Sequence, residues 1–163
     1  MNFSKFIIIN LFVIAQLIFL EASLANIRVV ASVNDEVITN FDILEEIKYL
    51  KVLNSNLENL DEKKLEKLAL NSLINEIIKR KEISKFINLN DENLKNQIIE
   101  EYLENLIIKM GYEDIDSFKN LLLQKRVYSI EKIKSKILIE FYWNELVYNK
   151  YNHQISINEE KIL

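Results

Sequence analysis

Grouped glutamates are the residues of this sequence whose type and spacing come closest to a catalytic or metal-binding pattern. Glu45 and Glu46 are adjacent, and three more glutamates lie between residues 100 and 104. Paired carboxylates act as general acid and base, or hold metal ions inside helical bundles. Adjacent helical residues point about 100° apart, and such metal bundles also need Glu-x-x-His pairs, which one histidine, His153, cannot supply. We therefore interpret these glutamates and His153 as solvent-facing residues.

The composition excludes several other kinds of site. Gly111 is the only glycine among the 163 residues, so neither a P-loop nor a G-x-G-x-x-G turn can form, since each needs several glycines. The chain has no cysteine, which excludes disulfides, thiolate metal sites and thiol nucleophiles. We expect no bound cofactor. The 21 basic and 25 acidic residues give a net charge of -4, so the charge balance gives no reason to expect nucleic-acid binding.

Two basic clusters, at residues 79–81 and 132–136, are accompanied by glutamates. We interpret both clusters as solvent-facing, because a run of mixed charges usually forms a solvated face. Contact with an anionic membrane or with an unfolded partner protein is the alternative.

Aromatic and apolar residues of the C-terminal half can line a groove for an extended, aromatic-rich segment of another protein. Flat amphipathic rings offer a large contact area with little loss of entropy. Packing in the core is the simpler interpretation, and we expect a core position for Trp143, which lies in a stretch (137–147) with apolar residues on all sides. The candidate partner-binding residues are Phe118, Leu122, Tyr128, Phe141 and Trp143.

The elements that position these residues are predicted to be mostly helices. Apolar periodicity predicts a mainly α domain of about five helices, with a short β-hairpin before them and a short strand after them. The hairpin is expected between Ile27 and Thr39, where β-branched residues flank an Asn-Asp-Glu turn. The first helix is expected at about 41–53, after a capping-box-like pair of Thr39 and Asp42. The other helices are expected from an Asp61 cap to about 78, from 90–92 to a left-handed cap at Gly111, from Asp116 to about 122, and at about 128–149. The expected inner face of the third helix holds Leu94, Ile98, Ile99, Tyr102, Leu103, Leu106 and Met110.

Residues 1–25 have the features of a secretory signal peptide. Lys5 precedes an almost wholly apolar run, Phe6 to Leu20, and small residues follow at Ser23 and Ala25. We expect cleavage after Ala25, so that the mature chain starts at Asn26 and is exported. An uncleaved membrane anchor is the alternative, although the run is shorter than the roughly 20 residues that span a bilayer. We expect no stable membrane insertion after cleavage.

The last residues repeat an earlier pattern. Residues 157–162 match the helix-opening pattern of residues 89–94, in which an apolar residue, a cap and two acidic residues precede another apolar residue. We therefore divide the chain into a signal peptide (1–25), a helical domain (26–157) and the start of a following helix or linker (158–163). On this interpretation the chain is the N-terminal part of a longer protein, and a frayed natural terminus is the alternative.

Four motifs in this order resemble the N-terminal domain of SurA-type periplasmic chaperones. They are V-V-A-S-V-N-D-E-V-I-T-N-F-D at 29–42, L-I-N-E-I-I at 73–78, L-N-D-E-N-L at 89–94 and Q-I-S-I at 154–157. The resemblance implies a non-enzymatic periplasmic module that binds unfolded outer-membrane proteins during outer-membrane assembly. It also implies a second partner, a C-terminal segment of the same protein that packs back onto this domain. The family's parvulin-type prolyl-isomerase domains are not among these residues.

Two other functions stay open at this point. The chain can be the N-terminal part of a secreted peptidyl-prolyl isomerase whose catalytic domain lies downstream. It can also be a helical structural or adhesion module of the cell envelope.

Overall fold

The computed structural model describes residues 26–89, 91 and 97–152. Several expectations concern residues outside these ranges. They are the signal peptide (1–25), most of the start of the third helix (90 and 92–96), the C-terminal strand (154–157) and the final segment (158–163).

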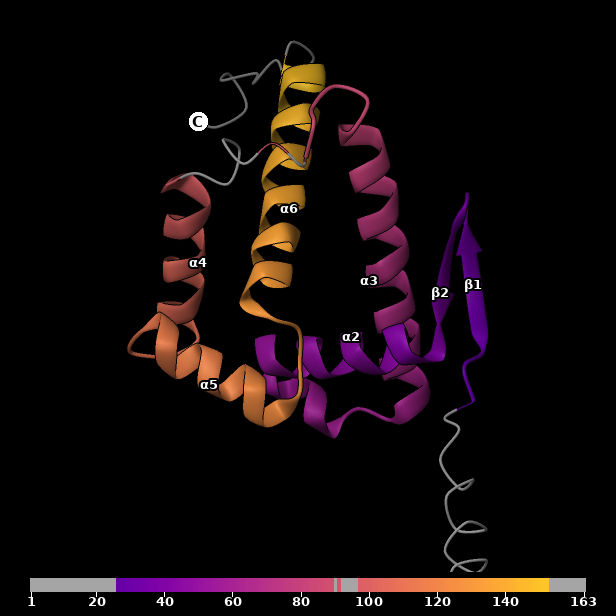
Figure 1. Ribbon diagram of the computed structural model, residues 1–163, viewed down its shortest axis with the longest axis vertical. Coiled ribbons are helices and arrows are strands. Elements are labelled where there is room, and N and C mark those ends of the chain that lie inside the picture. Colours follow the sequence, from indigo (N-terminus) through magenta and orange to yellow (C-terminus); the bar gives the residue numbers. More distant parts are fainter. Residues whose placement is uncertain (1–25, 90, 92–96, 153–163) are drawn as a thin grey trace, which may run out of the picture.

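The described residues form a mainly α structure with an N-terminal two-stranded hairpin, which confirms the expected fold class. Figure 1 shows α3, α6 and α4 standing side by side, with α6 in the middle and α2 and α5 lying across one end. The elements are β1 (Val29–Val33), β2 (Glu36–Thr39), α2 (Asn40–Leu53), the 3-10 helix η1 (Ser55–Asn59), α3 (Glu62–Ile83), α4 (Gln97–Lys109), α5 (Ile115–Lys125) and α6 (Ile130–Tyr151).

The hairpin forms where it was expected. β1 and β2 are antiparallel, and Asn34 in the turn between them has a left-handed backbone, with φ of 56°. Asn tolerates this conformation better than most residues. The inner face of the hairpin pairs Ala31 with Ile38, and Ile38 is 2% exposed against α2 and α3.

Side-chain caps fix where the helices begin. Thr39 and Asp42 form a capping box at the start of α2, and the Asp61 carboxylate accepts a hydrogen bond from the Lys64 backbone N–H at the start of α3. These two caps confirm the expected starts. The fourth helix was expected to open at Asp116, but α5 begins at Ile115, because Asp114 and Ser117 form a capping box two residues earlier than expected.

Two apolar clusters make up the core. The first joins the hairpin, α2 and α3 around Ile43, Ala69 and Ile77. The second joins α2, α4, α5 and α6 around Leu103 and Ile133. Helix α2 contributes to both clusters, so it links the two halves of the molecule.

The inner face of α4 differs from the expected one. Ile99, Leu103 and Ile107 are buried, whereas Ile98 and Tyr102 are 47% and 54% exposed. The buried residues follow a four-residue spacing, which keeps one narrow stripe of the helix against α6. The loop that follows contains Gly111 with φ of 85°, as expected for a left-handed helix end.

No helix within the described ranges is both long enough and apolar enough to cross a bilayer.

Candidate functional site

A groove between α4 and α6 is the part of the surface where aromatic and apolar side chains gather around a polar floor. Its volume is about 290 Å³. We call it the α4/α6 groove, and its lining residues are Tyr49, Tyr102, Leu106, Lys136, Ile137, Glu140, Phe141, Asn144 and Glu145.

Two aromatic rings that line this groove contact each other. Tyr102 of α4 and Phe141 of α6 have ring centroids 5.8 Å apart and meet edge to face, at an interplanar angle of 67°. The Phe141 ring also meets Tyr142 edge to face at 5.2 Å. Edge-to-face pairs fix ring orientation while leaving one face of a ring free to contact another apolar group. The groove therefore offers pre-positioned aromatic surface.

The floor of the groove leads into a buried cluster of polar groups centred on Glu46. The Glu46 side chain is fully buried on α2. Its carboxylate accepts hydrogen bonds from the Ser72 hydroxyl (2.6 Å), the Tyr128 hydroxyl (2.9 Å) and the Lys136 ammonium (2.9 Å). A buried carboxylate is stable only when it is paired and hydrogen-bonded, and these donors meet that requirement.

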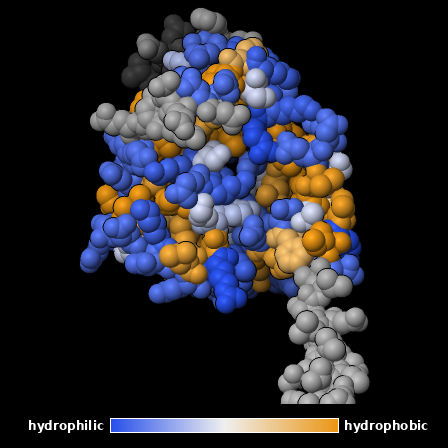
Figure 2. Space-filling model, in the orientation of Figure 1, coloured by the Kyte–Doolittle hydropathy of each residue, from blue (hydrophilic) through white to orange (hydrophobic). Residues whose placement is uncertain are grey.

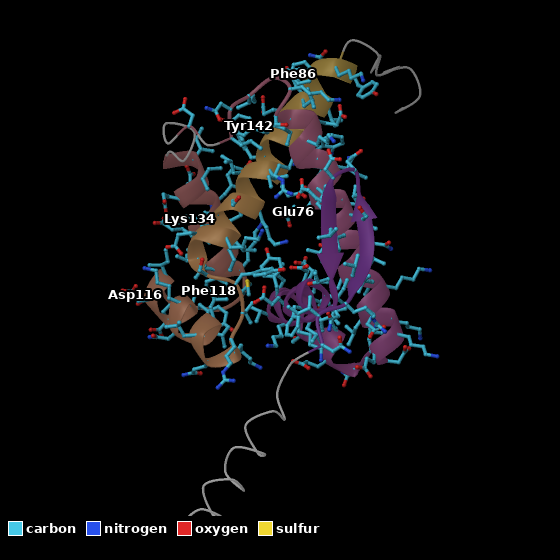
Figure 3. The ribbon with its side chains drawn as sticks, turned by 45° about the vertical axis from the view of Figure 1, so that its right-hand side comes forward. Glu76, Phe86, Asp116, Phe118, Lys134 and Tyr142 are labelled. Carbon is cyan, nitrogen blue, oxygen red and sulfur yellow. The ribbon has the colours of Figure 1, made fainter. Side chains whose placement is uncertain are left out.

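Lys136 connects Glu46 to a second carboxylate, Glu76 of α3. The Lys136 ammonium donates to both carboxylates, and Lys132 lies 3.5 Å from Glu76. Figure 3 shows Glu76 on the side of α3 that faces α6. Burial acts to raise the pKa of Glu76, but the charge and hydrogen bond of Lys136, together with Lys132 and Arg80, hold this pKa below its usual value.

Two tyrosine rings enclose the Lys136 ammonium. It lies 5.2 Å from the ring centroid of Tyr49 and 5.1 Å from that of Tyr128, and the two rings are 5.5 Å apart. Such distances allow cation–π attraction. Burial and the negative charge of Glu46 raise the pKa of both tyrosine hydroxyls, so both stay neutral near pH 7.

The hydrogen bonds and ion pairs of this cluster connect three helices. Glu46 belongs to α2, Glu76 to α3 and Lys136 to α6, and each carboxylate already accepts hydrogen bonds from side chains of the chain itself. Among the residues that the structure describes, no three His, Cys, Asp or Glu side chains gather closely enough to hold a metal ion. Lys136 and Tyr49 belong both to this cluster and to the lining of the α4/α6 groove, so the cluster fixes part of the groove wall.

Three of the candidate partner-binding residues lie in the core. Phe118, Leu122 and Tyr128 are 0%, 3% and 9% exposed and belong to one apolar cluster. Phe118 and Leu122 lie one turn apart on the inner face of α5, and Phe118 contacts the Tyr112 ring. In this fold these three side chains pack against the rest of the chain and present almost no surface to a partner, which corrects their assignment as binding residues.

The other two candidates are half-buried and lie on different sides of α6. Phe141 lines the α4/α6 groove, whereas Trp143 lies on the side of α3, with the Lys79 ammonium 5.9 Å from its ring. The expected core position of Trp143 is therefore wrong. A separation of two residues turns a helix by about 200°, so Phe141 and Trp143 cannot line one groove.

The sequence interpretation missed the buried ion cluster. Glu46 and Lys136 were both expected to face solvent, yet they are 0% and 8% exposed. A local signal exists, because each lies three residues after a buried isoleucine, Ile43 or Ile133, on the inward stripe of its helix. That signal does not identify which side chains pair with Glu46 and Lys136, since the three helices are far apart in the sequence and come together only in the folded chain.

Asn26, the expected first residue of the mature chain, is the first described residue. Its backbone carbonyl accepts a hydrogen bond from the Asn40 side chain at 3.1 Å. Ala25 lies outside the described ranges, so cleavage between these two residues stays a prediction.

Comparisons of the chain with family models, curated proteins and solved structures find no match. The resemblance to SurA-type chaperones therefore rests on the sequence motifs, and membership of that family stays a prediction.

Proposed function

We propose that this chain is a periplasmic chaperone module that binds unfolded segments of outer-membrane proteins and has no catalytic chemistry of its own. The observation that carries the proposal is the α4/α6 groove, where Tyr102 and Phe141 present aromatic surface above a rigid polar floor. Unfolded chains of β-barrel proteins expose apolar and aromatic side chains that such a surface can hold.

The polar rim of the groove suits this kind of ligand. Glu140, Asn144 and Glu145 border its apolar lining. Both carboxylate oxygens of Glu140 already accept from the Lys79 ammonium. An unfolded segment carries unpaired backbone N–H groups, and the oxygens of Asn144 and Glu145 can accept hydrogen bonds from them. Binding of this type needs no side-chain sequence motif, which fits a module that accepts many clients.

The proposal includes a second partner, a further segment of the same protein. Val147, Tyr148 and Tyr151 are exposed towards the end of α6, and Ile78 is exposed on α3. Exposed apolar side chains of this kind mark contact surfaces or promote aggregation. We expect a C-terminal segment supplied as a separate chain to raise the solubility of this one.

The test is the suppression of aggregation of an unfolded β-barrel protein, followed by light scattering without ATP. We expect the protein to slow aggregation, and Tyr102→Ser to weaken this effect because Tyr102 is exposed in the groove. Ile108→Ser is the matched control, since Ile108 is also exposed on α4 but does not line the groove.

Three outcomes would contradict parts of the proposal. An equal loss of aggregation suppression in Tyr102→Ser and Ile108→Ser would exclude the α4/α6 groove as the binding site. No affinity for β-barrel precursors would exclude the chaperone function. Catalysed isomerisation of a proline test peptide would show that the chain has catalytic chemistry after all.

A further inference from the structure

A second depression lies on the far side of α3 from α6, between the hairpin, the start of α2 and the start of α3. Its volume is about 390 Å³. We call it the hairpin groove, and the residues that carry its chemistry are Arg28, Val30, Leu44, Lys63, Lys67 and Leu70.

The floor of the hairpin groove is apolar although it faces solvent. Val30 and Leu44 are 41% and 50% exposed, and Leu70 is half-buried beside them. On the same hairpin Val37 is 58% exposed. Val37 lies outside the lining of the groove, whereas Val30, Leu44 and Leu70 line it together, and exposed apolar side chains that lie together mark contact surfaces. Figure 2 shows apolar side chains gathered over the hairpin, on the right of the view.

The rim of the hairpin groove is basic. The side chains of Arg28, Lys63 and Lys67 are exposed, and none lies within 4.0 Å of a carboxylate of another described residue. Glu66 is the one acidic residue in the lining. The protein as a whole carries a net charge of -4, so three unpaired cations around one apolar floor form a local reversal of its charge. Such a reversal attracts a negatively charged partner.

The walls of this groove are held in place by the chain itself. The Asn40 backbone N–H donates to the Arg28 carbonyl at 2.9 Å, and the Asn40 side chain accepts from the Arg28 backbone N–H at 2.8 Å. On the opposite wall, Lys63 and Lys67 are one turn apart on α3, which places them about 6 Å apart along the helix axis. A ligand therefore meets a formed surface and does not have to order it.

We propose that the hairpin groove binds an acidic, extended segment of another protein, in which apolar residues alternate with aspartate or glutamate. From Lys63 to Leu70 the groove runs about 10 Å along α3, the length of about three extended residues. Alternate apolar side chains of such a segment contact Val30, Leu44 and Leu70. The long side chains of Arg28, Lys63 and Lys67 reach its carboxylates from both walls.

This site is separate from the α4/α6 groove, so it adds a function to the proposed chaperone. A hollow with cations on two walls fits a chain segment better than it fits the flat surface of an anionic membrane, which would contact the rims and leave the floor uncovered.

The experiment measures binding of a short fluorescent peptide of alternating glutamate and valine to the purified protein by fluorescence anisotropy. Its matched probe carries lysine in place of glutamate. We expect the acidic probe to bind, the basic probe to show no binding, and the affinity to fall as salt rises from about 0.1 M to about 1 M, where the Debye length shrinks from about 10 Å to about 3 Å. The double variant Lys63→Glu/Lys67→Glu should lower the affinity for the acidic probe by at least about tenfold, since it replaces electrostatic attraction by repulsion.

Lys48→Glu/Lys125→Glu is the control for total charge. Both lysines are exposed, both line a different depression beside α5, and neither forms an ion pair with another described residue. We expect this control to bind the acidic probe as the wild type does. A further variant, Leu44→Ser, should weaken binding without changing the salt dependence.

Equal weakening by the two double variants, or equal binding of the two probes, would overturn the proposal. A second result would also overturn it. If the peptide does not bind, and the protein sediments with phosphatidylglycerol vesicles only when Lys63 and Lys67 are present, the groove binds a lipid surface. Failure here would leave the chaperone proposal intact, since Lys63→Glu/Lys67→Glu is expected to keep full suppression of β-barrel aggregation.

Discussion

Lys136 is one of two charged side chains in the described part of the chain that are buried, the other being Glu46. Lys136 is 8% exposed, it donates hydrogen bonds to two carboxylates on two other helices, and it lies between two tyrosine rings. The attraction among these groups offsets the cost of removing them from water only while all of them are present. At the scale of single residues, the stability of the fold therefore depends on this ammonium.

Replacing Lys136 by methionine should destabilise the protein strongly. Lys136→Met leaves the fully buried Glu46 carboxylate without a cation, and breaking a buried pair in this way costs about 3–5 kcal/mol. Lys134→Met is the control, because Lys134 of the same helix pairs with Glu100 at a partly exposed site, where a pair contributes about 1 kcal/mol or less. Urea denaturation of both variants checks this, and equal losses would show that the buried pair contributes no more than the exposed one.

The Glu76 carboxylate should make stability depend on pH. Its pKa lies below the usual 4.5 in the folded protein, so the folded state favours the ionised form. This contribution is present at pH values above 4.5 and is lost as the pH falls below it. We expect Glu76→Gln to have a lower free energy of unfolding than the wild type at pH 7, and the gap to narrow as the pH falls below 4.5. Denaturation curves over the acid range measure this, and a gap that stays constant with pH would contradict it.

At the scale of the elements, the sequence predicts the turns and helix caps that residues close together in the chain form. The hairpin turn at Asn34 and the caps at Thr39 and Asp61 involve residues within a few positions of each other, and the structure confirms all three. The inner face of α4 was partly wrong, because Ile98 and Tyr102 are apolar enough to be buried but lie beside the stripe that meets α6. Which apolar residues stay exposed is decided by the neighbouring helices, and a single periodicity does not contain that information.

The end of α5 gives a prediction in the stabilising direction. Arg126 caps this helix with a left-handed backbone, φ 50° and ψ 53°, a conformation that costs a residue with a side chain about 1 kcal/mol and costs glycine little. We expect Arg126→Gly to raise the melting temperature. Asn120→Gly, at an exposed position in the middle of the helix, should lower it, since glycine has the lower helix propensity. Calorimetry of both variants measures whether the melting temperature rises or falls. A lower melting temperature for Arg126→Gly would show that the contacts of the arginine side chain contribute more stability than its left-handed backbone costs.

At the scale of the whole molecule, the sequence predicted the class of the fold. Apolar residues on all sides of the last helix left open whether it is central or covered by a segment from outside this chain. Its apolar residues on several sides fit the position of α6 between α3 and α4 in Figure 1. The sequence did not predict which residues meet at that centre. Glu46, Glu76 and Lys136 are far apart along the chain, and nothing in the spacing of one of them identifies the other two.

Export of the whole chain is expected to remove its first 25 residues. The basic start, the apolar run from Phe6 and the small residues before Asn26 are the basis for this expectation. Mass spectrometry of the protein from the periplasm should give a chain that begins at Asn26. A membrane-bound product that retains Met1 would instead support the uncleaved anchor.

The buried ion cluster has a consequence for the order in which the chain can fold. The chain is synthesised from its N-terminus, so α2 and α3, which carry Glu46 and Glu76, are complete before α6, which carries Lys136. Two carboxylates without their cation oppose burial, so we expect the packing of α2 against α3 to be weaker in the absence of Lys136. We therefore expect a chain truncated before α6 to be cleaved by proteases faster than the full chain.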